Sequence, residues 1–269
     1  MDEEGKAMVE IHREACIGCG ECVKDCISGA LSLKEGKAVY AGACIHCGHC
    51  VAICPAQAVS IPAYDMDEVE PCRADAYRID ADTLLRAIKC RRSIRHFTAQ
   101  KIAKEKLTAV VQAGRYTATG GNRQGCCFVL VQDELQTLKD TVWKGIEEAA
   151  LNASASSKES TLSMNRFLTM RNERGIDFLF RNAPCVVYIT AESPIDAGLA
   201  AQNMEMMAVA QGLGVLYNGF LQHATSANPN ALGWLGVSDA PIRVCMLMGF
   251  PQTTYQRTAP RKKANVIWR

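Results

Sequence analysis

Hydrophobic and polar positions follow two patterns in the larger part of the chain. Leu84, Leu85 and Ile88 recur at helical spacing behind Asp82, which predicts a helix with Asp82 as its N-cap. Two more helices are predicted, one over residues 103–116 and one over the long, mostly apolar stretch 196–212. Apolar runs of strand length that are rich in branched residues predict β-strands at residues 128–132, 185–190 and 244–248. Helices and strands are therefore mixed in this part of the chain.

Two helical stretches carry further expectations. Met204, Met206 and Met207 lie in the stretch 196–212 and are expected to be buried core residues without a special role. Residues 144–174 are polar, rich in serine and compatible with a helix. We expect this segment to form a mobile cover over a site.

The N-terminal part contains an internal repeat of a cysteine motif. Residues 15–26 and 43–54 align so that each of four cysteines recurs 28 residues later, as Cys16 does at Cys44. A turn of small residues and a short apolar segment follow each copy, at residues 28–33 and 56–61. The repeat predicts two related halves, each with a loop and a short strand.

The periodicity fades after the second copy, in an acidic stretch that ends at Pro71. We interpret residues 1–62 as one domain, residues 63–79 as a linker and residues 80–269 as a second domain. A chain of 269 residues is long enough for one small and one larger core.

Composition narrows the classes of protein that fit. The formal net charge is +2 and the basic residues are dispersed, which argues against nucleic-acid binding. No apolar run has the roughly 18–20 residues that span a membrane, and the acidic N-terminus is unlike a secretory signal, so we expect a cytoplasmic protein. The chain has 14 cysteines, which in this setting indicate metal or redox chemistry rather than a disulfide framework.

The cysteine spacing is typical of iron–sulfur clusters. Cys-x₂-Cys-x₂-Cys supplies three thiolates, and in two-cluster proteins the distal cysteine of each motif binds the other cube. We therefore expect two [4Fe–4S] clusters, held by Cys16, Cys19, Cys22 and Cys54 and by Cys44, Cys47, Cys50 and Cys26. Neither a zinc site nor a disulfide scaffold explains the triple spacing plus a distant fourth cysteine. The segment resembles a bacterial two-cluster ferredoxin, although Ile27 stands where that family often has proline.

Several residues besides the motif cysteines carry groups that are capable of redox or acid–base chemistry. His46 and His49 flank the second loop and are candidates for tuning its potential, but exposed loop histidines are the simpler interpretation and no catalytic role is assigned. Cys126 and Cys127 are adjacent, so on a regular strand they face opposite sides, and one of them is expected to face a cofactor or a subunit boundary. The remaining cysteines are expected to be packing residues: Cys72, Cys90, Cys185 and Cys245.

A basic group follows the first predicted helix of the second domain. Arg91, Arg92 and Arg95 place three guanidiniums beside the hydroxyl of Ser93. Arginine forks and a hydroxyl suit a phosphate group. Taken alone, the same residues equally fit the solvated basic end of a helix.

Four further motifs occur in order after this group, at residues 115–124, 212–219, 249–251 and 260–263. Together with the basic group they resemble the nitroreductase family of FMN enzymes, from about residue 80 to residue 269. The resemblance implies an α+β domain and an intertwined homodimer with FMN at the subunit boundary. Gly212 and Gly214 do not belong to a complete Gly-x-Gly-x-x-Gly motif, so Rossmann binding of NAD is disfavoured.

The resemblance also assigns roles to single residues. It implies that Arg91, Arg92, Ser93, Arg95, Arg261 and Lys263 bind FMN, mainly at its phosphate, and that Thr119, Asn122, Asn218 and Gly219 lie near the flavin ring. Asn122 and the backbone N–H of Gly219, which would approach flavin N5, are the implied catalytic groups. Two departures concern the family's usual Pro-Ser and Pro-Trp pairs, which are replaced by Ala118-Thr119 and Gly125-Cys126. The substrate side of the site is therefore expected to be atypical.

Joined, the two parts predict an FMN-dependent oxidoreductase. Single electrons enter through two [4Fe–4S] clusters, collect on FMN and leave as a pair to a small nitroaromatic, quinone or enone. A low-potential electron-donor protein is a candidate partner. The alternatives are an NAD(P)H-driven nitroreductase with secondary clusters, a non-catalytic electron carrier, and flavin fragmentation or dehalogenation.

Overall fold

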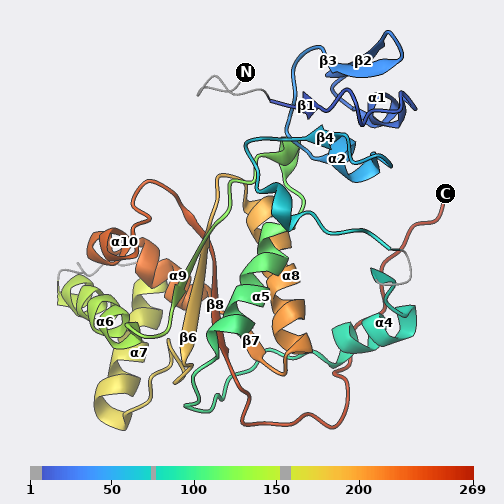
Figure 1. Ribbon diagram of the computed structural model, residues 1–269. Helices are drawn as coiled ribbons and strands as arrows, with labels where there is room; N and C mark the ends of the chain where they lie inside the picture. The colour runs from blue at the N-terminus through green and yellow to red at the C-terminus, as the bar shows by residue number, and fades with distance from the viewer. Residues whose placement is uncertain (1–7, 74–76, 152–158) are drawn as a thin grey trace. The chain divides into compact units, whose positions relative to one another are not determined.

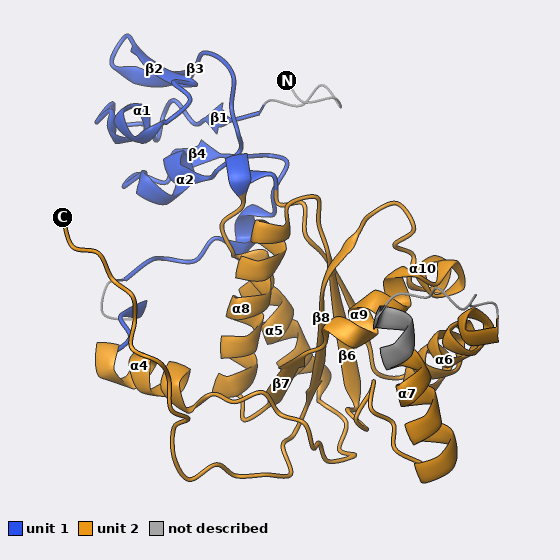
Figure 2. Cartoon of the chain, turned by 180° about the vertical axis from the view of Figure 1, so that it is seen from behind, with its two compact units in different colours: residues 1–80, 120–123 blue, residues 81–119, 124–269 orange. Residues whose placement is uncertain are grey.

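The computed structural model describes residues 8–73, 77–151 and 159–269, apart from the side chains of residues 159–163. The chain forms two compact units, which are coloured separately in Figure 2. Unit 1 comprises residues 1–80 and 120–123, and unit 2 comprises residues 81–119 and 124–269. In the described residues, no helix is long and apolar enough to cross a membrane.

Unit 1 repeats one small motif twice. Helices α1 (Glu21–Asp25) and α2 (His49–Ile53) begin 28 residues apart. Each is preceded by a glycine with a left-handed backbone, Gly20 at φ 77° and Gly48 at φ 75°. This conformation strains residues that carry a Cβ, which explains why both copies have glycine there.

Two short antiparallel pairs of strands complete the repeat. The strands are β1 (Glu10–Ile11), β2 (Leu31–Lys34), β3 (Lys37–Tyr40) and β4 (Val59–Ser60), and β1 pairs with β4 while β2 pairs with β3. The core of unit 1 contains Val9, Leu31, Ala38, Ala58, Val59, Ile61 and the cysteines Cys16, Cys22 and Cys50. The expected linker is not wholly irregular, because it contains the 3₁₀ turn η1 (Met66–Glu68).

Unit 2 is built on an antiparallel sheet of the order β5-β6-β8-β7 among the described residues. Its strands are β5 (Cys127–Val131), β6 (Cys185–Thr190), β7 (Gly214–Tyr217) and β8 (Ile242–Gly249). The predicted strand at residues 185–190 is confirmed in full, while β5 begins one residue before its predicted position and β8 is longer at both ends. Hydrophobic runs locate strands well, but hydrogen-bond pairing decides where they end.

Helices cover both faces of the sheet, as Figure 1 shows. One layer contains α5 (Lys104–Arg115) and α8 (Pro194–Ala210), and the other contains α6 (Leu135–Leu151), α7 (Glu159–Arg174), α9 (Gly219–Ser226) and α10 (Pro229–Leu235). The alternation of β6 explains the two layers. Val186 and Tyr188 pack with the α6 side, whereas Val187 and Ile189 pack with α5 and α8. Met204 is fully buried in the layer of α5 and α8, and Met207 is partly buried against the same core.

Helix α4 (Ala81–Cys90) confirms the predicted helix but differs from expectation at its start. It begins at Ala81, so Asp82 lies in the first turn and is not the N-cap; there its charge favours the positive end of the helix dipole. None of its residues is buried, and its apolar residues Leu84, Leu85 and Ile88 are 40–47% exposed. The expected cover at residues 144–174 is divided between α6 and α7, and its middle, residues 152–158, lies outside the described residues.

Candidate functional site

One group of cysteines in unit 1 draws its members from both copies of the repeat. The pKa of Cys22 is raised by burial and then by the negative charges of Cys54, Cys19 and Cys16. Charges act in this way only at short range, so Cys54, Cys19 and Cys16 all lie in the neighbourhood of Cys22. Cys54 comes from the second motif and the other three from the first, which is the crossed arrangement expected from the spacing.

The second group is crossed in the same way. Cys26, Cys44, Cys47 and Cys50 line one small cavity of unit 1, together with apolar side chains that include Val9 and Leu31. Burial raises the pKa of Cys50 to about 11. A cluster whose irons bind this sulfur would favour the thiolate and offset that burial.

Equivalent backbone N–H groups donate hydrogen bonds to cysteine sulfurs in both copies of the repeat. Ala30 N donates to Cys26 Sγ at 3.2 Å, and Ala58 N donates to Cys54 Sγ at 3.3 Å. Burial works against the charged form of Cys26, but hydrogen bonds from Ser28, Ala30 and Leu31 outweigh it and lower the pKa of this thiol. Donors of this kind stabilise thiolates and tune cluster potentials. The donor set therefore fits two iron–sulfur clusters.

Asn122 lies in unit 1, in the 3₁₀ turn η2 (Gly120–Asn122). Its Nδ2 donates to His46 O at 2.8 Å and to Ile45 O at 3.1 Å, inside the loop between Cys44 and Cys47. Tyr64 also donates to His46 O, at 3.1 Å. The side chain that the family resemblance assigns to the flavin ring is thus bonded to the second cluster loop.

The His46 side chain is more enclosed than the expected exposed loop histidine. Its Nε2 is buried and has no hydrogen-bond partner among the described residues. The ring also meets that of Tyr64 edge-on, with 6.2 Å between centroids. His49, in contrast, is exposed and lies 3.0 Å from an Asp25 carboxylate oxygen.

Unit 2 contains a cavity of about 460 Å³, and three of the residues predicted to bind the flavin line it. It is lined by Arg95, Met164, Phe178, Arg181, Leu216, Tyr217, Asn218, Gly219, Phe220 and His223. The strand β7, the N-terminus of α9 and the turn before β6 therefore meet at one place. Arg95, Asn218 and Gly219 were expected from the sequence, whereas Arg181 and the two phenylalanines were not.

Asn218 and Gly219 have separate functions at the start of α9. Asn218 is buried; its Oδ1 accepts from Leu221 N at 3.0 Å and its Nδ2 donates to Leu179 O at 2.6 Å. This side chain is therefore the N-cap of the helix and holds it in place. A Cβ built on Gly219 would meet no atom within 4 Å, so the backbone there borders open space. The absence of a side chain leaves room for a flat ligand to approach the backbone here, as a flavin ring requires.

Arg91 forms an ion pair on the other layer of unit 2. Its Nη1 lies 2.8 Å from Oε1 of Glu205, which is 1% exposed on helix α8. Burial raises the pKa of the Tyr217 hydroxyl, and the Glu205 charge raises it further. A buried carboxylate needs a cation partner. Arg91 thus has a structural task that its position in the phosphate-like motif did not indicate.

The other residues predicted to bind FMN are dispersed. The Arg92 guanidinium donates to Lys89 O, and Ser93 makes an isolated bridge with Val215 of β7. Thr119 accepts a hydrogen bond from Gln124 N at 2.9 Å. Arg261 and Lys263 are exposed in the extended tail and do not line the cavity in this single chain.

Arg181 is the main residue that sequence reasoning missed. Its guanidinium lies 4.1 Å from the ring centroid of Phe178, and burial and the charge of Arg95 lower its pKa. Arg181 and Asn182 both have positive φ, 50° and 54°. No motif marks this turn, so only the fold reveals that Arg181 lines the same cavity as Gly219.

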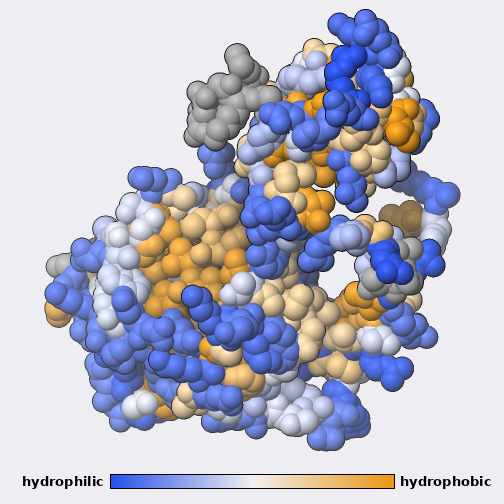
Figure 3. All heavy atoms as spheres, viewed as in Figure 1, coloured by the Kyte–Doolittle hydropathy of each residue, from blue (hydrophilic) through white to orange (hydrophobic). Residues whose placement is uncertain are grey.

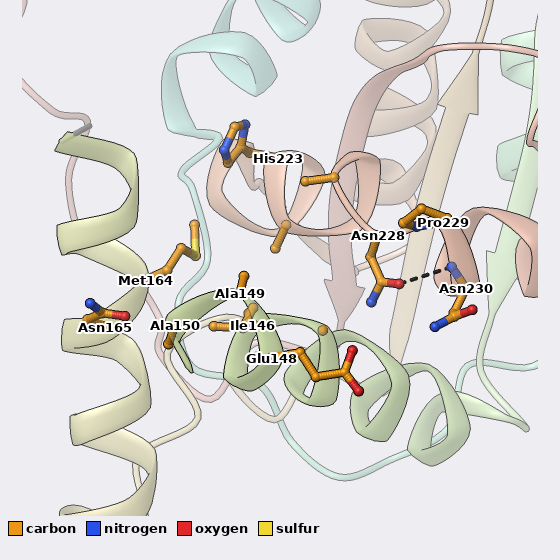
Figure 4. A pocket seen from close by; sticks show the side chains of 13 residues that line it. Ile146, Glu148, Ala149, Ala150, Met164, Asn165, His223, Asn228, Pro229 and Asn230 are labelled. Atoms are coloured by element: carbon orange, nitrogen blue, oxygen red, sulfur yellow. Dashed lines mark hydrogen bonds between the residues drawn. The ribbon is translucent and has the colours of Figure 1, made fainter. Parts of the chain in front are cut away.

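A second cavity of about 380 Å³ lies among α6, α7, α9 and the start of α10 (Figure 4). Glu148 lines it, and Asn228 Oδ1 accepts from Asn230 N at 3.0 Å, as the dashed line shows. Met164 and His223 border both cavities. Since this cavity holds none of the predicted site residues and no arginine among the described residues, the first cavity is the candidate flavin site.

The two motif sets and the helix-covered sheet define a redox protein with an iron–sulfur part and a flavin-binding part. The chain belongs to the nitroreductase family, whose model matches residues 88–250. A model described as a 4Fe-4S dicluster domain matches residues 15–59. The family resemblance and the α+β fold class predicted from the sequence are confirmed, and the protein is a nitroreductase-like flavin oxidoreductase.

The similarity to known proteins extends over about two thirds of the chain. It is 25% identical over 183 residues to an NADPH-flavin oxidoreductase of Vibrio harveyi, covering 68% of this chain and 71% of the relative. A nitroreductase with bound FMN from Bacteroides fragilis matches with a TM-score of 0.56 and 20% identity, over 68% of this chain and 98% of that one. Another from Desulfitobacterium hafniense, also with bound FMN, matches with a TM-score of 0.53 and 23% identity, over 70% and 100%. These structures support the fold.

Proposed function

We propose that this protein is an FMN-dependent oxidoreductase that receives electrons through two [4Fe–4S] clusters and reduces a small acceptor, such as a nitroaromatic, a quinone or an enone. The observation that carries the proposal is the presence of two crossed cysteine groups and a flavin-type cavity in one chain. The tether raises the effective concentration of the donor at the flavin far above that of a free ferredoxin.

The proposed cluster ligands are the eight motif cysteines in two crossed sets. Cys16, Cys19, Cys22 and Cys54 hold one cluster, and Cys26, Cys44, Cys47 and Cys50 hold the other. All 14 cysteines are free thiols in the structure, which agrees with our proposal of a reducing, cytoplasmic location.

The proposed FMN site is centred on the cavity beside Gly219. FMN, when bound, accepts electrons singly and delivers them in pairs. The N–H of Gly219 would hold the ring, Arg95 would supply positive charge, and the Asn218 cap keeps the helix N-terminus in position. Arg92, Ser93, Arg261 and Lys263 remain proposed phosphate contacts, the last two from the tail. A quinone acceptor would take two electrons and two protons and leave as a hydroquinone.

We propose a homodimer in which this tail covers a second copy of unit 2. Strand β5 is an edge strand, and a groove beside it is lined by apolar residues that include Leu107, Val129 and Trp234. Figure 3 shows hydrophobic side chains gathered over β5 and β6. The tail carries Ile267 and Trp268, which are 78% and 90% exposed. An open edge and exposed apolar residues both need a cover, and each copy supplies what the other lacks.

The alternative electron donor is NADPH. The Vibrio harveyi relative is named an NADPH-flavin oxidoreductase, which favours direct reduction of the flavin by a nicotinamide. In that case the clusters would be secondary to turnover.

Full-length protein with one ligand of each cluster replaced, Cys22→Ala with Cys50→Ala, separates the two routes. We expect it to keep FMN, to be reduced by dithionite as fast as the wild type, and to lose rapid flavin reduction by a low-potential ferredoxin under anaerobic conditions. Stopped-flow absorbance of the flavin measures all three. If ferredoxin reduces both proteins at one rate, or if only NADPH reduces the wild type, the cluster route is wrong.

A further inference from the structure

The candidate flavin cavity has an excess of positive charge. Arg95 and Arg181 both line it, with His223 nearby, and no Asp or Glu side chain is among the described residues of its wall. Asp177, which accepts a hydrogen bond from Arg181 N through its backbone carbonyl, directs its carboxylate to Lys139 at 3.5 Å. Two guanidiniums without a carboxylate among these residues favour an anionic ligand.

The wall around Arg181 is aromatic and ordered. The Phe178 and Phe167 rings stack with 4.5 Å between centroids and 15° between planes, and Phe220 meets both edge-on. Arg181 lies over the free side of Phe178, 4.1 Å from its centroid. A guanidinium held over an aromatic ring has N–H groups that remain available to an oxyanion.

The backbone holds this guanidinium in place at a conformational cost. Arg181 and Asn182 have φ values of 50° and 54°, which are unfavourable for residues with a Cβ. Hydrogen bonds from Arg181 N to Asp177 O at 2.9 Å and from Ala183 N to Phe180 O at 2.9 Å fix the turn. Strain of this type persists where the surrounding structure determines it, and it often accompanies a ligand site.

We propose that Arg181 binds the carboxylate of an aromatic acceptor whose ring packs against Phe220 and the edge of Phe178. The inference rests on the proposed function and deepens it, because it names an aromatic acid as the acceptor class. Anionic oxygens also occur on FMN itself, so the test distinguishes the acceptor from the cofactor as the source of the negative charge.

The test compares 4-nitrobenzoate with its neutral analogue 4-nitrobenzamide, using FMN-loaded full-length protein. Reduction of either nitro group to nitroso takes two electrons and two protons from the reduced flavin and releases water. For the wild type we expect KM to be at least about tenfold lower for 4-nitrobenzoate, with similar kcat, since a charged hydrogen bond contributes a factor of this size. Arg181→Gln should abolish the preference, and Arg181→Lys should keep part of it. Arg174→Gln, an exposed arginine at the end of α7, is the matched control and should change nothing.

Binding is also measured without turnover. Benzoate should perturb the flavin absorbance of the oxidised wild type at lower concentration than benzamide, and this comparison holds even if Arg181→Gln fails to fold. Equal affinity of the wild type for both ligands overturns the proposal. So does an Arg181→Gln protein that loses FMN but keeps the preference for 4-nitrobenzoate, since the anion would then belong to the cofactor. Failure of both acceptors to be reduced, with benzoate still bound preferentially, would count against the proposed reaction and support the binding site.

Discussion

The cysteine groups and the flavin cavity are encoded differently along the chain. All eight motif cysteines lie within residues 16–54, and the geometry that groups them repeats after 28 residues. The cavity, in contrast, takes Arg95 from the loop after α4, Arg181 from the turn before β6 and Gly219 from the start of α9. Ligand spacing alone therefore indicated the first site, whereas the second exists only when distant segments meet.

Two single residues that belong to sequence motifs show the same difference. Cys54 is grouped by the structure with the partners that the spacing predicted. Arg91 fits the phosphate-binding pattern equally well, yet its guanidinium lies against buried Glu205, far along the chain on α8. A short motif determines local geometry, but a long side chain can find its partner elsewhere.

The largest effect is expected at the crossed cysteines. Cys54→Ala removes the fourth ligand of the group around Cys22, so iron content should fall from about eight to about four per chain. Iron analysis and electron paramagnetic resonance after anaerobic reconstitution measure this change. Cys72→Ala, an exposed cysteine outside the motif, is the control and should retain all iron. Selective loss of the cluster held by Cys44, Cys47 and Cys50 would show that the ligation is not crossed.

The next effect concerns the Arg91–Glu205 pair. Removing one partner of a buried ion pair typically costs about 3–5 kcal/mol, so Arg91→Ala should lower the free energy of unfolding of the FMN-free protein by about that amount. Arg91→Met with Glu205→Leu should recover much of the loss, because no unpaired charge remains buried.

The exposed pair of Lys101 and Asp133, with side chains 69% and 82% exposed, is the matched control. Lys101→Ala should cost less than about 1 kcal/mol. An Arg91→Ala protein that binds FMN more weakly but unfolds like the wild type would contradict this structural role. It would indicate that Arg91 binds the FMN phosphate instead.

A smaller effect is expected at the C-terminal tail. Trp268→Ala should weaken the proposed dimer by about 2 kcal/mol or more, which is roughly thirtyfold in the dissociation constant. Analytical ultracentrifugation over a dilution series measures it. Tyr116→Ala, which removes another exposed aromatic ring, should leave the dimer unchanged. A wild-type protein that is monomeric at all concentrations would contradict the dimer.

The smallest effect is expected at Asn122, which the family resemblance assigns to the flavin and which the structure bonds to the second cluster loop. Asn122→Ala removes two hydrogen bonds to the carbonyls of Ile45 and His46, each contributing about 1 kcal/mol. We expect an altered electron paramagnetic resonance spectrum of the cluster held by Cys44, Cys47 and Cys50, with unchanged FMN affinity. The reverse result, weaker FMN binding with an unchanged spectrum, would assign Asn122 to the flavin.

Much of the fold was determined by local patterns. The buried strand at residues 185–190 and the helix predicted at residues 103–116, observed as Lys104–Arg115, follow from runs and periodicities that few other structures satisfy. The predicted helix at Leu84, Leu85 and Ile88 is also present as α4, but an apolar stripe indicates a helix without indicating what covers it. In the single chain these side chains stay exposed.

The sequence by itself determined the cysteine groups, since an iron–sulfur cube requires thiolates at fixed short spacings and the repeat supplies them twice. Only the tertiary structure decided the character of the flavin cavity. Arg181 has no distinctive neighbours in the sequence, and it lines the same cavity as Gly219 because β6 pairs with β8 and α9 packs on that sheet. Long-range packing brings such residues together through contacts between distant segments, and no local spacing records which segments will meet.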